Sequence, residues 1–229
     1  MQAKIVEIFK SVQGEGKYLG VTQVFVRFFE CNIHCVWCDT PHSIGDTTRR
    51  YTEYTPDALI TEIKALWDHC HSVSLTGGEP LVQADAIVQL LTVFKSLRMP
   101  VYLETNGILP DELSKVIDKV DIIAMDLKLP SSTQCPPFWK EHEEFLKIAR
   151  QKDVFLKVVI SKSTTLDDVQ QAVDLASRVA PDVPFILQPN YSDMKDGAVE
   201  KCVEFQKHCF KSLRDVRIVP QMHNFMKVR

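Results

Sequence analysis

The chain has 229 residues, of which 45% are hydrophobic and 25% charged, and its formal net charge is -3. This composition is typical of a packed globular protein and excludes a disordered or fibrous chain. The small negative charge offers no basic surface for nucleic acid, and no apolar run approaches the roughly 20 residues that span a bilayer. The N-terminal residues lack the apolar core of a signal peptide, so we expect a cytoplasmic protein with one domain over residues 1–229.

Short segments rich in β-branched and aromatic residues alternate with longer segments that have helical spacing. The predicted strands, in chain order, span residues 24–29, 72–76, 101–105, 121–127, 154–160, 184–188 and 216–220. The predicted helices span residues 56–70, 84–97, 110–119, 138–151, 166–179 and 193–213. In the first of these helices, Leu59, Ile60, Ile63 and Leu66 fall on one face.

The strand–helix alternation repeats about six times, which predicts a parallel sheet with right-handed crossovers. A closed eightfold barrel needs about 250 residues. The six units therefore favour an incomplete (βα)6 barrel of parallel strands with the helices outside, and an open doubly wound sheet is the alternative. Both architectures place the active site at the C-terminal ends of the strands.

Polar and glycine-rich motifs follow five of the predicted strands. In chain order they are a cysteine-rich loop, TGGEP (76–80), ETNG (104–107), Asp126 with Lys128, and QPN (188–190). Each of the glycine-rich motifs alone is explained by a turn at a strand end. Their joint placement at strand ends favours one site built from all five.

Three of the seven cysteines, Cys31, Cys35 and Cys38, lie within eight residues of one another. In a reducing compartment such clustered thiols bind metal or perform redox chemistry. Three cysteines can hold a 4Fe–4S cluster with one open iron position, which is free to bind a substrate or cofactor. The alternatives are a Cys3His zinc site completed by His42, a Cys35/Cys38 redox pair, and three buried structural thiols. The scattered cysteines are predicted to be buried structural residues; they are Cys70, Cys135, Cys202 and Cys209.

The C-x3-C-x2-C spacing directly after the first strand, with Trp37 before the last cysteine, resembles the signature of the radical S-adenosylmethionine superfamily. TGGEP resembles the glycine-rich second motif of that superfamily. The resemblance implies that the open iron chelates the amino and carboxylate groups of S-adenosylmethionine, whose cleavage yields a radical that abstracts hydrogen from substrate.

Within the superfamily, two subfamilies match the length of the chain: activases that install a glycyl radical on a partner protein, and 7-carboxy-7-deazaguanine synthases. The chain is similar to the synthases almost end to end, most specifically in residues 13–16 (QGEG) and 38–40 (CDT), and also in residues 220–223 (PQMH). The resemblance implies conversion of 6-carboxy-5,6,7,8-tetrahydropterin to 7-carboxy-7-deazaguanine with loss of ammonia, in queuosine- and archaeosine-type 7-deazapurine synthesis. It also implies a homodimer and an electron donor such as flavodoxin or ferredoxin.

The same resemblance implies roles for individual residues. The pterin is expected to contact Val12, Gln13, Gly14, Arg27, Thr76, His223 and the terminal Arg229. S-adenosylmethionine is expected to contact Trp37, Cys38, Asp39, Gly78, Asp126, Leu127, Lys128, Gln188, Pro189 and Asn190. Thr40 is expected to bind Mg²⁺, and Glu15 is the candidate for proton handling. The chain departs from many bacterial synthases, which have Ser-Pro-Lys at 126–128 and Lys at position 224, and these departures bear on the individual S-adenosylmethionine contacts.

Overall fold

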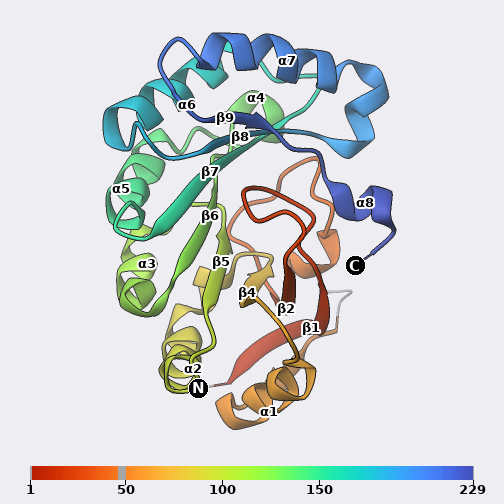
Figure 1. Cartoon of the computed structure of the whole chain (residues 1–229), viewed down its shortest axis with the longest axis vertical. Helices are drawn as coiled ribbons and strands as arrows, with labels where there is room; N and C mark the ends of the chain where they lie inside the picture. Colours follow the sequence, from red (N-terminus) through yellow and green to blue (C-terminus); the bar gives the residue numbers. More distant parts are fainter. Residues whose placement is uncertain (1, 46–49, 229) are drawn as a thin grey trace.

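One sheet of nine strands organises the part of the chain that the computed structural model describes, residues 2–45 and 50–228. Seven of these strands are parallel and follow the chain order across the sheet (Figure 1). They are β2 (Thr22–Phe28), β4 (Ser72–Gly77), β5 (Val101–Thr105), β6 (Ile122–Asp126), β7 (Asp153–Ile160), β8 (Phe185–Pro189) and β9 (Val216–Ile218). A doubly wound sheet reverses its strand order at a switch point, and the absence of such a reversal among these strands excludes that alternative.

The N-terminal segment adds two strands that were not among the predicted strands. β1 (Ala3–Val12) pairs antiparallel with β2, and the short β3 (Thr52–Tyr54) pairs antiparallel with β1 at the sheet edge. The opposite edge is β9, so the sheet is curved but not closed. The incomplete barrel is therefore confirmed, with six predicted strands in place and the seventh short.

Helices connect the parallel strands and lie along the outer side of the curved sheet (Figure 1). The long ones are α1 (Pro56–Leu66), α2 (Ala84–Ser96), α3 (Pro110–Val116), α5 (Trp139–Ala149), α6 (Leu166–Val179) and α7 (Ala198–Cys209). Two short ones are α4 (Pro130–Thr133), between β6 and α5, and α8 (Met222–Met226), after β9. Among the described residues, no helix is long and apolar enough to cross a membrane.

The last predicted helix, 193–213, is divided in the structure. Residues 191–196 form a 3-10 turn, and α7 begins only after Gly197, whose φ is +92°. A left-handed residue cannot continue a right-handed helix, and glycine adopts that conformation at no steric cost. The apolar periodicity runs across this break, which is why sequence spacing alone predicts one continuous helix.

Two apolar clusters lie on opposite faces of the sheet. The large one packs the helices against the outer face, and α6 illustrates it with Val169, Val173 and Ala176 facing inward at helical spacing. The small one fills part of the concave face; it consists of Tyr102, Ile122, Ala124, Phe155 and Ile186. The rest of the concave face, toward the C-terminal strand ends, is lined by polar residues and forms the site.

Candidate active site

The cysteine loop follows β2 and is fixed by backbone hydrogen bonds at both ends. The Glu30 amide donates to the Ser43 carbonyl at 2.7 Å, and the Cys31 amide donates to the Ile44 carbonyl at 3.1 Å. Cys31, Cys35 and Cys38 are free and partly buried. Burial raises the pKa of the Cys31 thiol to about 11 and that of Cys35 to about 12.

The three thiols are not arranged as the ligands of a preformed zinc site. A zinc tetrahedron with Zn–S bonds of roughly 2.3 Å brings its sulfur ligands within about 4 Å of one another. Among the described residues, the cysteines and His42 are not gathered into such a group. Three thiolates that share one wall of a cavity at a wider spacing fit a multi-iron cluster, because each cysteine then binds a different iron.

The TGGEP motif lies directly against this loop. A Cβ at Gly78 would lie 2.0 Å from the Glu30 carbonyl oxygen, and one at Gly77, whose φ is +130°, would lie 2.3 Å from that of Phe28. Both positions therefore require glycine. The Glu79 amide donates to the Glu30 carbonyl at 2.8 Å, which holds the end of β4 beside the cysteines.

Glu79 is a buried carboxyl that joins three segments of the site. It accepts hydrogen bonds from the Asn106 amide at 2.7 Å, the Leu81 amide at 3.1 Å and the Thr105 hydroxyl at 3.0 Å. The Asn106 side chain in turn donates to Asn32 of the cysteine loop at 2.7 Å. Burial raises the pKa of Glu79 to about 7 despite these donors. Sequence reasoning gave Glu79 no separate role, although it lies inside the TGGEP motif.

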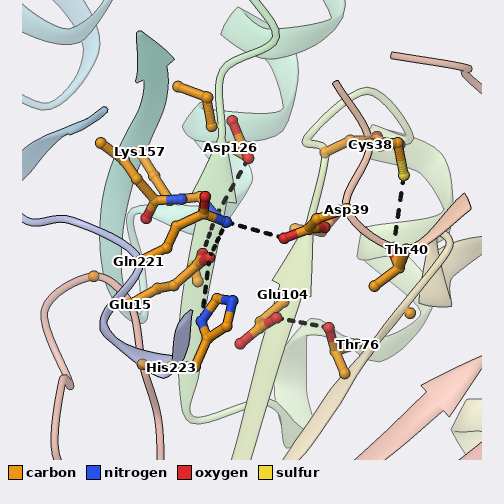
Figure 2. Close-up of a pocket in the computed structure, with 18 of the residues that line it drawn as sticks. Glu15, Cys38, Asp39, Thr40, Thr76, Glu104, Asp126, Lys157, Gln221 and His223 are labelled. Carbon is orange, nitrogen blue, oxygen red and sulfur yellow. Dashed lines mark hydrogen bonds and ion pairs between the residues drawn. The ribbon is translucent and has the colours of Figure 1, made fainter. Parts of the chain in front are cut away.

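At the other end of the cavity, Glu104 on β5 organises the expected pterin contacts. One of its oxygens accepts from Gln13 Nε2 at 2.7 Å. The other accepts from Thr76 Oγ1 at 2.6 Å (Figure 2). Arg27 lines the same cavity, and its Nε donates to Glu7 at 2.7 Å. Glu104 was not predicted as a site residue; its position two residues before the asparagine of ETNG is the one signal that the sequence offers.

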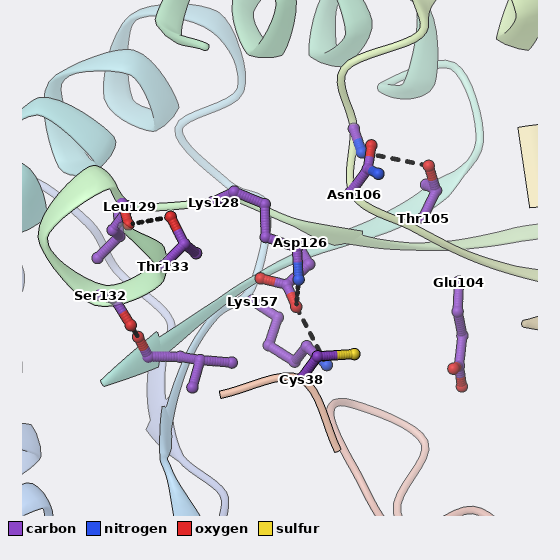
Figure 3. A network of polar contacts seen from close by, with 12 residues as sticks. Cys38, Glu104, Thr105, Asn106, Asp126, Lys128, Leu129, Ser132, Thr133 and Lys157 are labelled. Atoms are coloured by element: carbon purple, nitrogen blue, oxygen red, sulfur yellow. Dashed lines mark hydrogen bonds and ion pairs between the residues drawn. The ribbon is translucent and has the colours of Figure 1, made fainter. Parts of the chain in front are cut away.

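Buried charges connect the two ends of the site. Lys157 Nζ lies 2.6 Å from Glu15 (Figure 2). It also lies 3.4 Å from Asp126, whose other cation, Lys128 Nζ, lies 2.9 Å away (Figure 3). The Lys157 cation, with the Gln221 amide, lowers the pKa of Glu15 to about 2 although burial opposes that shift. Lys157 was not predicted, because a lysine in the middle of an apolar strand has no motif around it.

Two buried oxygen atoms of the site have no hydrogen-bond partner within the described chain: Asp126 Oδ1 and Gln188 Oε1. Buried polar atoms are almost always paired in folded proteins, so these acceptors point to a ligand with donor groups. Beside them, the Lys128 ammonium lies 4.9 Å from the Trp37 ring centre, and Trp37 donates to Ser132 at 3.0 Å. A pocket with unpaired acceptor oxygens fits S-adenosylmethionine, because the amino, ribose and adenine groups of that molecule carry hydrogen-bond donors.

The C-terminal tail closes over the cavity. Gln221 Nε2 donates to Glu15 and to Asp39, each at 2.9 Å, and His223 Nδ1 lies 3.9 Å from Glu15 (Figure 2). The Met222 amide donates to the Gly14 carbonyl at 2.9 Å. A Cβ at Gly14 would lie 2.7 Å from His223, so glycine at this position permits the tail to approach.

Most of the predicted site residues line one cavity of about 390 Å³, within the roughly 300–1,000 Å³ of small-molecule sites. They are Val12, Gln13, Gly14, Glu15, Arg27, Cys31, Cys35, Trp37, Cys38, Asp39, Thr40, Thr76, Gly78, Asp126, Lys128, Gln188 and His223. Leu127 and Pro189 are not among these lining residues: Leu127 packs in the core, and Pro189 is buried at the end of β8. Asn190 lies at an adjoining hollow, where it caps the turn through Ser192, and Arg229 lies outside the described residues.

The comparisons with known proteins agree with this geometry. Residues 26–186 match the Radical SAM superfamily model. The chain is 38% identical to the 7-carboxy-7-deazaguanine synthase of Geobacter sulfurreducens over 98% of this chain and 97% of that protein. It is 34% identical to that of Archaeoglobus fulgidus over the whole of both chains.

The fold matches solved structures at lower identity. The crystal structure of QueE from Escherichia coli superposes with a TM-score of 0.68 at 21% identity, covering 96% of this chain and 94% of that one. The structure of TYW1 with a lysine–pyruvate adduct superposes with a TM-score of 0.61 over 83% of this chain and 74% of that one. The extent and identity of the sequence matches show that the chain belongs to the 7-carboxy-7-deazaguanine synthase family of the radical S-adenosylmethionine superfamily.

Proposed function

We propose that this chain converts 6-carboxy-5,6,7,8-tetrahydropterin to 7-carboxy-7-deazaguanine with loss of ammonia. The observation that carries the proposal is one cavity that is lined both by the three cysteines and by Gln13, Thr76 and Arg27. A cavity of this kind brings a cluster-bound cofactor and a pterin into contact. The family's relatives are synthases, which favours this reaction over glycyl-radical activation of a partner protein.

Cys31, Cys35 and Cys38 would hold the 4Fe–4S cluster, and the unpartnered oxygens of Asp126 and Gln188 would accept hydrogen bonds from S-adenosylmethionine. When bound, these groups supply the radical that removes a hydrogen atom from the substrate. The protein's part is to place the substrate and exclude water, because a radical in an open site reacts with the wrong partner.

Arg27 is suited to bind the substrate carboxylate. Its Nε is already fixed by Glu7 at 2.7 Å, so the guanidinium of this cavity-lining residue is held in one orientation. A planar guanidinium binds a carboxylate through two parallel hydrogen bonds. Glu104 would act differently, by holding the Gln13 amide and the Thr76 hydroxyl in one orientation for the pterin ring.

Thr40 would bind Mg²⁺ in the same cavity. It lines the cavity next to Cys38, whose sulfur lies 3.8 Å from the Thr40 hydroxyl. Mg²⁺ prefers oxygen ligands and retains several waters, so one hydroxyl with substrate oxygens is sufficient. The neighbouring carboxylates of Asp39 and Glu15, which lie within 4.8 Å of each other, add negative charge that supports a cation here.

The direct test is anaerobic reconstitution with iron and sulfide, followed by incubation with the carboxytetrahydropterin, S-adenosylmethionine and a low-potential reductant. Formation of 7-carboxy-7-deazaguanine and of ammonia, detected by mass spectrometry, supports the proposal. Reductive cleavage of S-adenosylmethionine without the deazaguanine would leave a radical enzyme with another substrate. Flavodoxin and ferredoxin, compared as reductants in the same assay, test the proposed electron donor, and light scattering tests the proposed homodimer.

A further inference from the structure

Cys135, one of the scattered cysteines, lies against the cysteine loop. The chain after α4 runs beside residues 34–36: Cys135 Sγ donates to the His34 carbonyl at 3.5 Å, and the Val36 amide donates to the Thr133 carbonyl at 3.1 Å. The prediction that the scattered cysteines are all buried is wrong for Cys135, which is partly exposed, as is Cys70. Sequence spacing gives no sign of this contact, because 100 residues separate Cys135 from Cys35.

The contact brings Cys135 within reach of Cys35. The His34 carbonyl belongs to the peptide bond that precedes Cys35, so its oxygen lies roughly 2.8 Å from the Cys35 Cα by covalent geometry. The Cys135 sulfur is therefore within roughly 6.3 Å of that Cα. A cysteine sulfur lies roughly 2.8 Å from its own Cα, so rotation of the Cys35 side chain can bring the two sulfurs to roughly 3.5 Å from each other, from where a small movement of the loop permits a disulfide. Both side chains are partly exposed, so an oxidant can reach them.

Local structure fixes Cys135 at this place. Gln134 ends α4 in the left-handed conformation with φ +59°, and the Cys135 amide donates to the Thr133 hydroxyl at 3.2 Å. Pro136 and Pro137 follow, and proline restricts the backbone on both sides of its own position. The sulfur is held beside the loop by the fold and is not carried there by a loose segment.

We propose that Cys135 is a resolving cysteine that forms a disulfide with Cys35 when oxidation removes the cluster, and so preserves the cluster site for repair. This inference rests on the proposed cluster at Cys31, Cys35 and Cys38. The site would meet a peroxide, a two-electron oxidant that converts thiolates to sulfenic acids. In the intact enzyme Cys35 is occupied by iron, so the reaction is confined to protein that has lost it.

The step balances as follows. The Cys35 thiolate attacks one oxygen of hydrogen peroxide, the O–O bond breaks, and a sulfenic acid and, after proton uptake, water result. The Cys135 thiol then attacks the Cys35 sulfur, the S–OH bond breaks, and the disulfide and a second water form. Two thiols have been oxidised and one peroxide reduced. A dithiol reverses the change by exchange through a mixed disulfide, which returns both thiols and permits iron to bind again.

The proposal predicts a different fate for Cys35 when Cys135 is replaced. A sulfenic acid with no thiol beside it is oxidised further to the sulfinic and sulfonic acids, which dithiols do not reduce. Cys135→Ser is therefore expected to bind the same amount of iron as the wild type before oxidation. After oxidation and dithiol treatment, it should recover several-fold less iron. Cys70→Ser is the matched control, since Cys70 is also partly exposed but contacts Leu66 and Asp68 instead.

The experiment treats the reconstituted enzyme anaerobically with a slight excess of hydrogen peroxide, alkylates free thiols under denaturing conditions, and maps disulfides by peptide mass spectrometry. The expected product is a peptide pair that joins Cys35 to Cys135, absent from Cys135→Ser and retained in Cys70→Ser. Iron content is measured before oxidation and after dithiol treatment and reconstitution.

Each outcome decides the proposal separately from the proposed function. Disulfides confined to Cys31, Cys35 and Cys38, or equal iron recovery by Cys135→Ser and the wild type, would overturn it. Loss of initial iron binding in Cys135→Ser would also overturn it and would make Cys135 a cluster ligand. Wild-type protein that never binds iron would instead refute the proposed cluster. Disulfide mapping in that iron-free protein would still test whether Cys35 pairs with Cys135.

Discussion

The two ends of the cavity are built in different ways. The cysteine end comes from neighbouring residues: three thiols within eight positions and two glycines that permit β4 to lie against them. The tail end comes from residues far apart in the chain, since Gln221 joins Glu15, 206 positions away, and Asp39, 182 positions away. A local motif survives small shifts of the fold, whereas the tail end depends on the whole barrel being assembled. Variants at the two ends should therefore fail in different ways.

The largest effect is expected at the cysteine end. Replacing Cys31, Cys35 or Cys38 with Ala should abolish iron binding and S-adenosylmethionine cleavage, because a cluster with one open iron needs all three remaining thiolates. Iron content and the visible absorption of anaerobically reconstituted protein measure the loss. The buried Cys202, far from the site in the apolar core, supplies a control in Cys202→Ala, which should retain both properties. A full iron complement in any of the three ligand variants would contradict the assignment.

The next effect concerns the charges between the two ends. Lys157→Met leaves the largely buried Glu15 carboxylate without its cation, whereas Asp126 keeps the Lys128 ammonium at 2.9 Å. The loss is expected to cost about 3 kcal/mol of unfolding free energy. Because Glu15 also loses its orientation, kcat/KM should fall by about 100-fold, equivalent to about 2.7 kcal/mol. Chemical denaturation and steady-state kinetics measure the two. The control is Lys147→Met, which removes an exposed pair with Glu143 on α5 and should change stability by less than about 0.5 kcal/mol. Equal losses of stability in the two variants would contradict a special role for the ion pairs of Lys157.

At the tail end, His223→Ala should raise KM for the pterin about tenfold, the size of one lost hydrogen bond to a charged or polar partner. The affinity for S-adenosylmethionine should change less than that for the pterin, because the His223 ring contacts Glu15 and only borders Asp39, which lies within 4.8 Å. A C-terminal tag should act in the same direction, whereas an N-terminal tag should be harmless. Isothermal titration with each ligand separates the two affinities. Wild-type kinetics for a tagged C-terminus would remove the tail from the substrate site.

A further effect, on stability and not on substrate affinity, is expected from Glu79, whose pKa is raised to about 7 by burial. Between its ordinary value of 4.5 and about 7, the unfolded chain has released the proton that the folded protein retains, so stability falls as pH rises through that window. The maximal difference is about 3 kcal/mol. Glu79→Gln should flatten the decline, measured as unfolding free energy of iron-free protein from pH 4.5 to 7.5. Glu15 acts in the reverse sense below pH 4.5, because its pKa is lowered. An identical pH profile of stability in Glu79→Gln and the wild type would contradict the assignment of this decline to Glu79.

Much of the fold and of the cysteine end could be predicted from the sequence. The residues that could not be predicted were missed for physical reasons. The strands, the barrel and the cysteine end follow from periodicity and from motifs a few residues long. Glu104 lay inside the predicted ETNG motif but was not singled out, and Lys157 could not be predicted, because it lies within an apolar strand and reaches the site only through the pairing of β6 with β7. Leu127 was predicted as a cofactor contact from its neighbours, but strand alternation turns its side chain into the core.

The measurement that tests the joint action of the two ends most directly is the ratio of deazaguanine formed to S-adenosylmethionine consumed. If the two ends act together, the wild type should form deazaguanine in a fixed ratio to the S-adenosylmethionine that it consumes. Gln221→Ala, which releases the tail from Glu15 and Asp39, should still cleave the cofactor while product falls, so the ratio drops. A wild-type ratio of zero, or a ratio in Gln221→Ala equal to that of the wild type, would contradict a site in which the cysteine end and the tail end work as one.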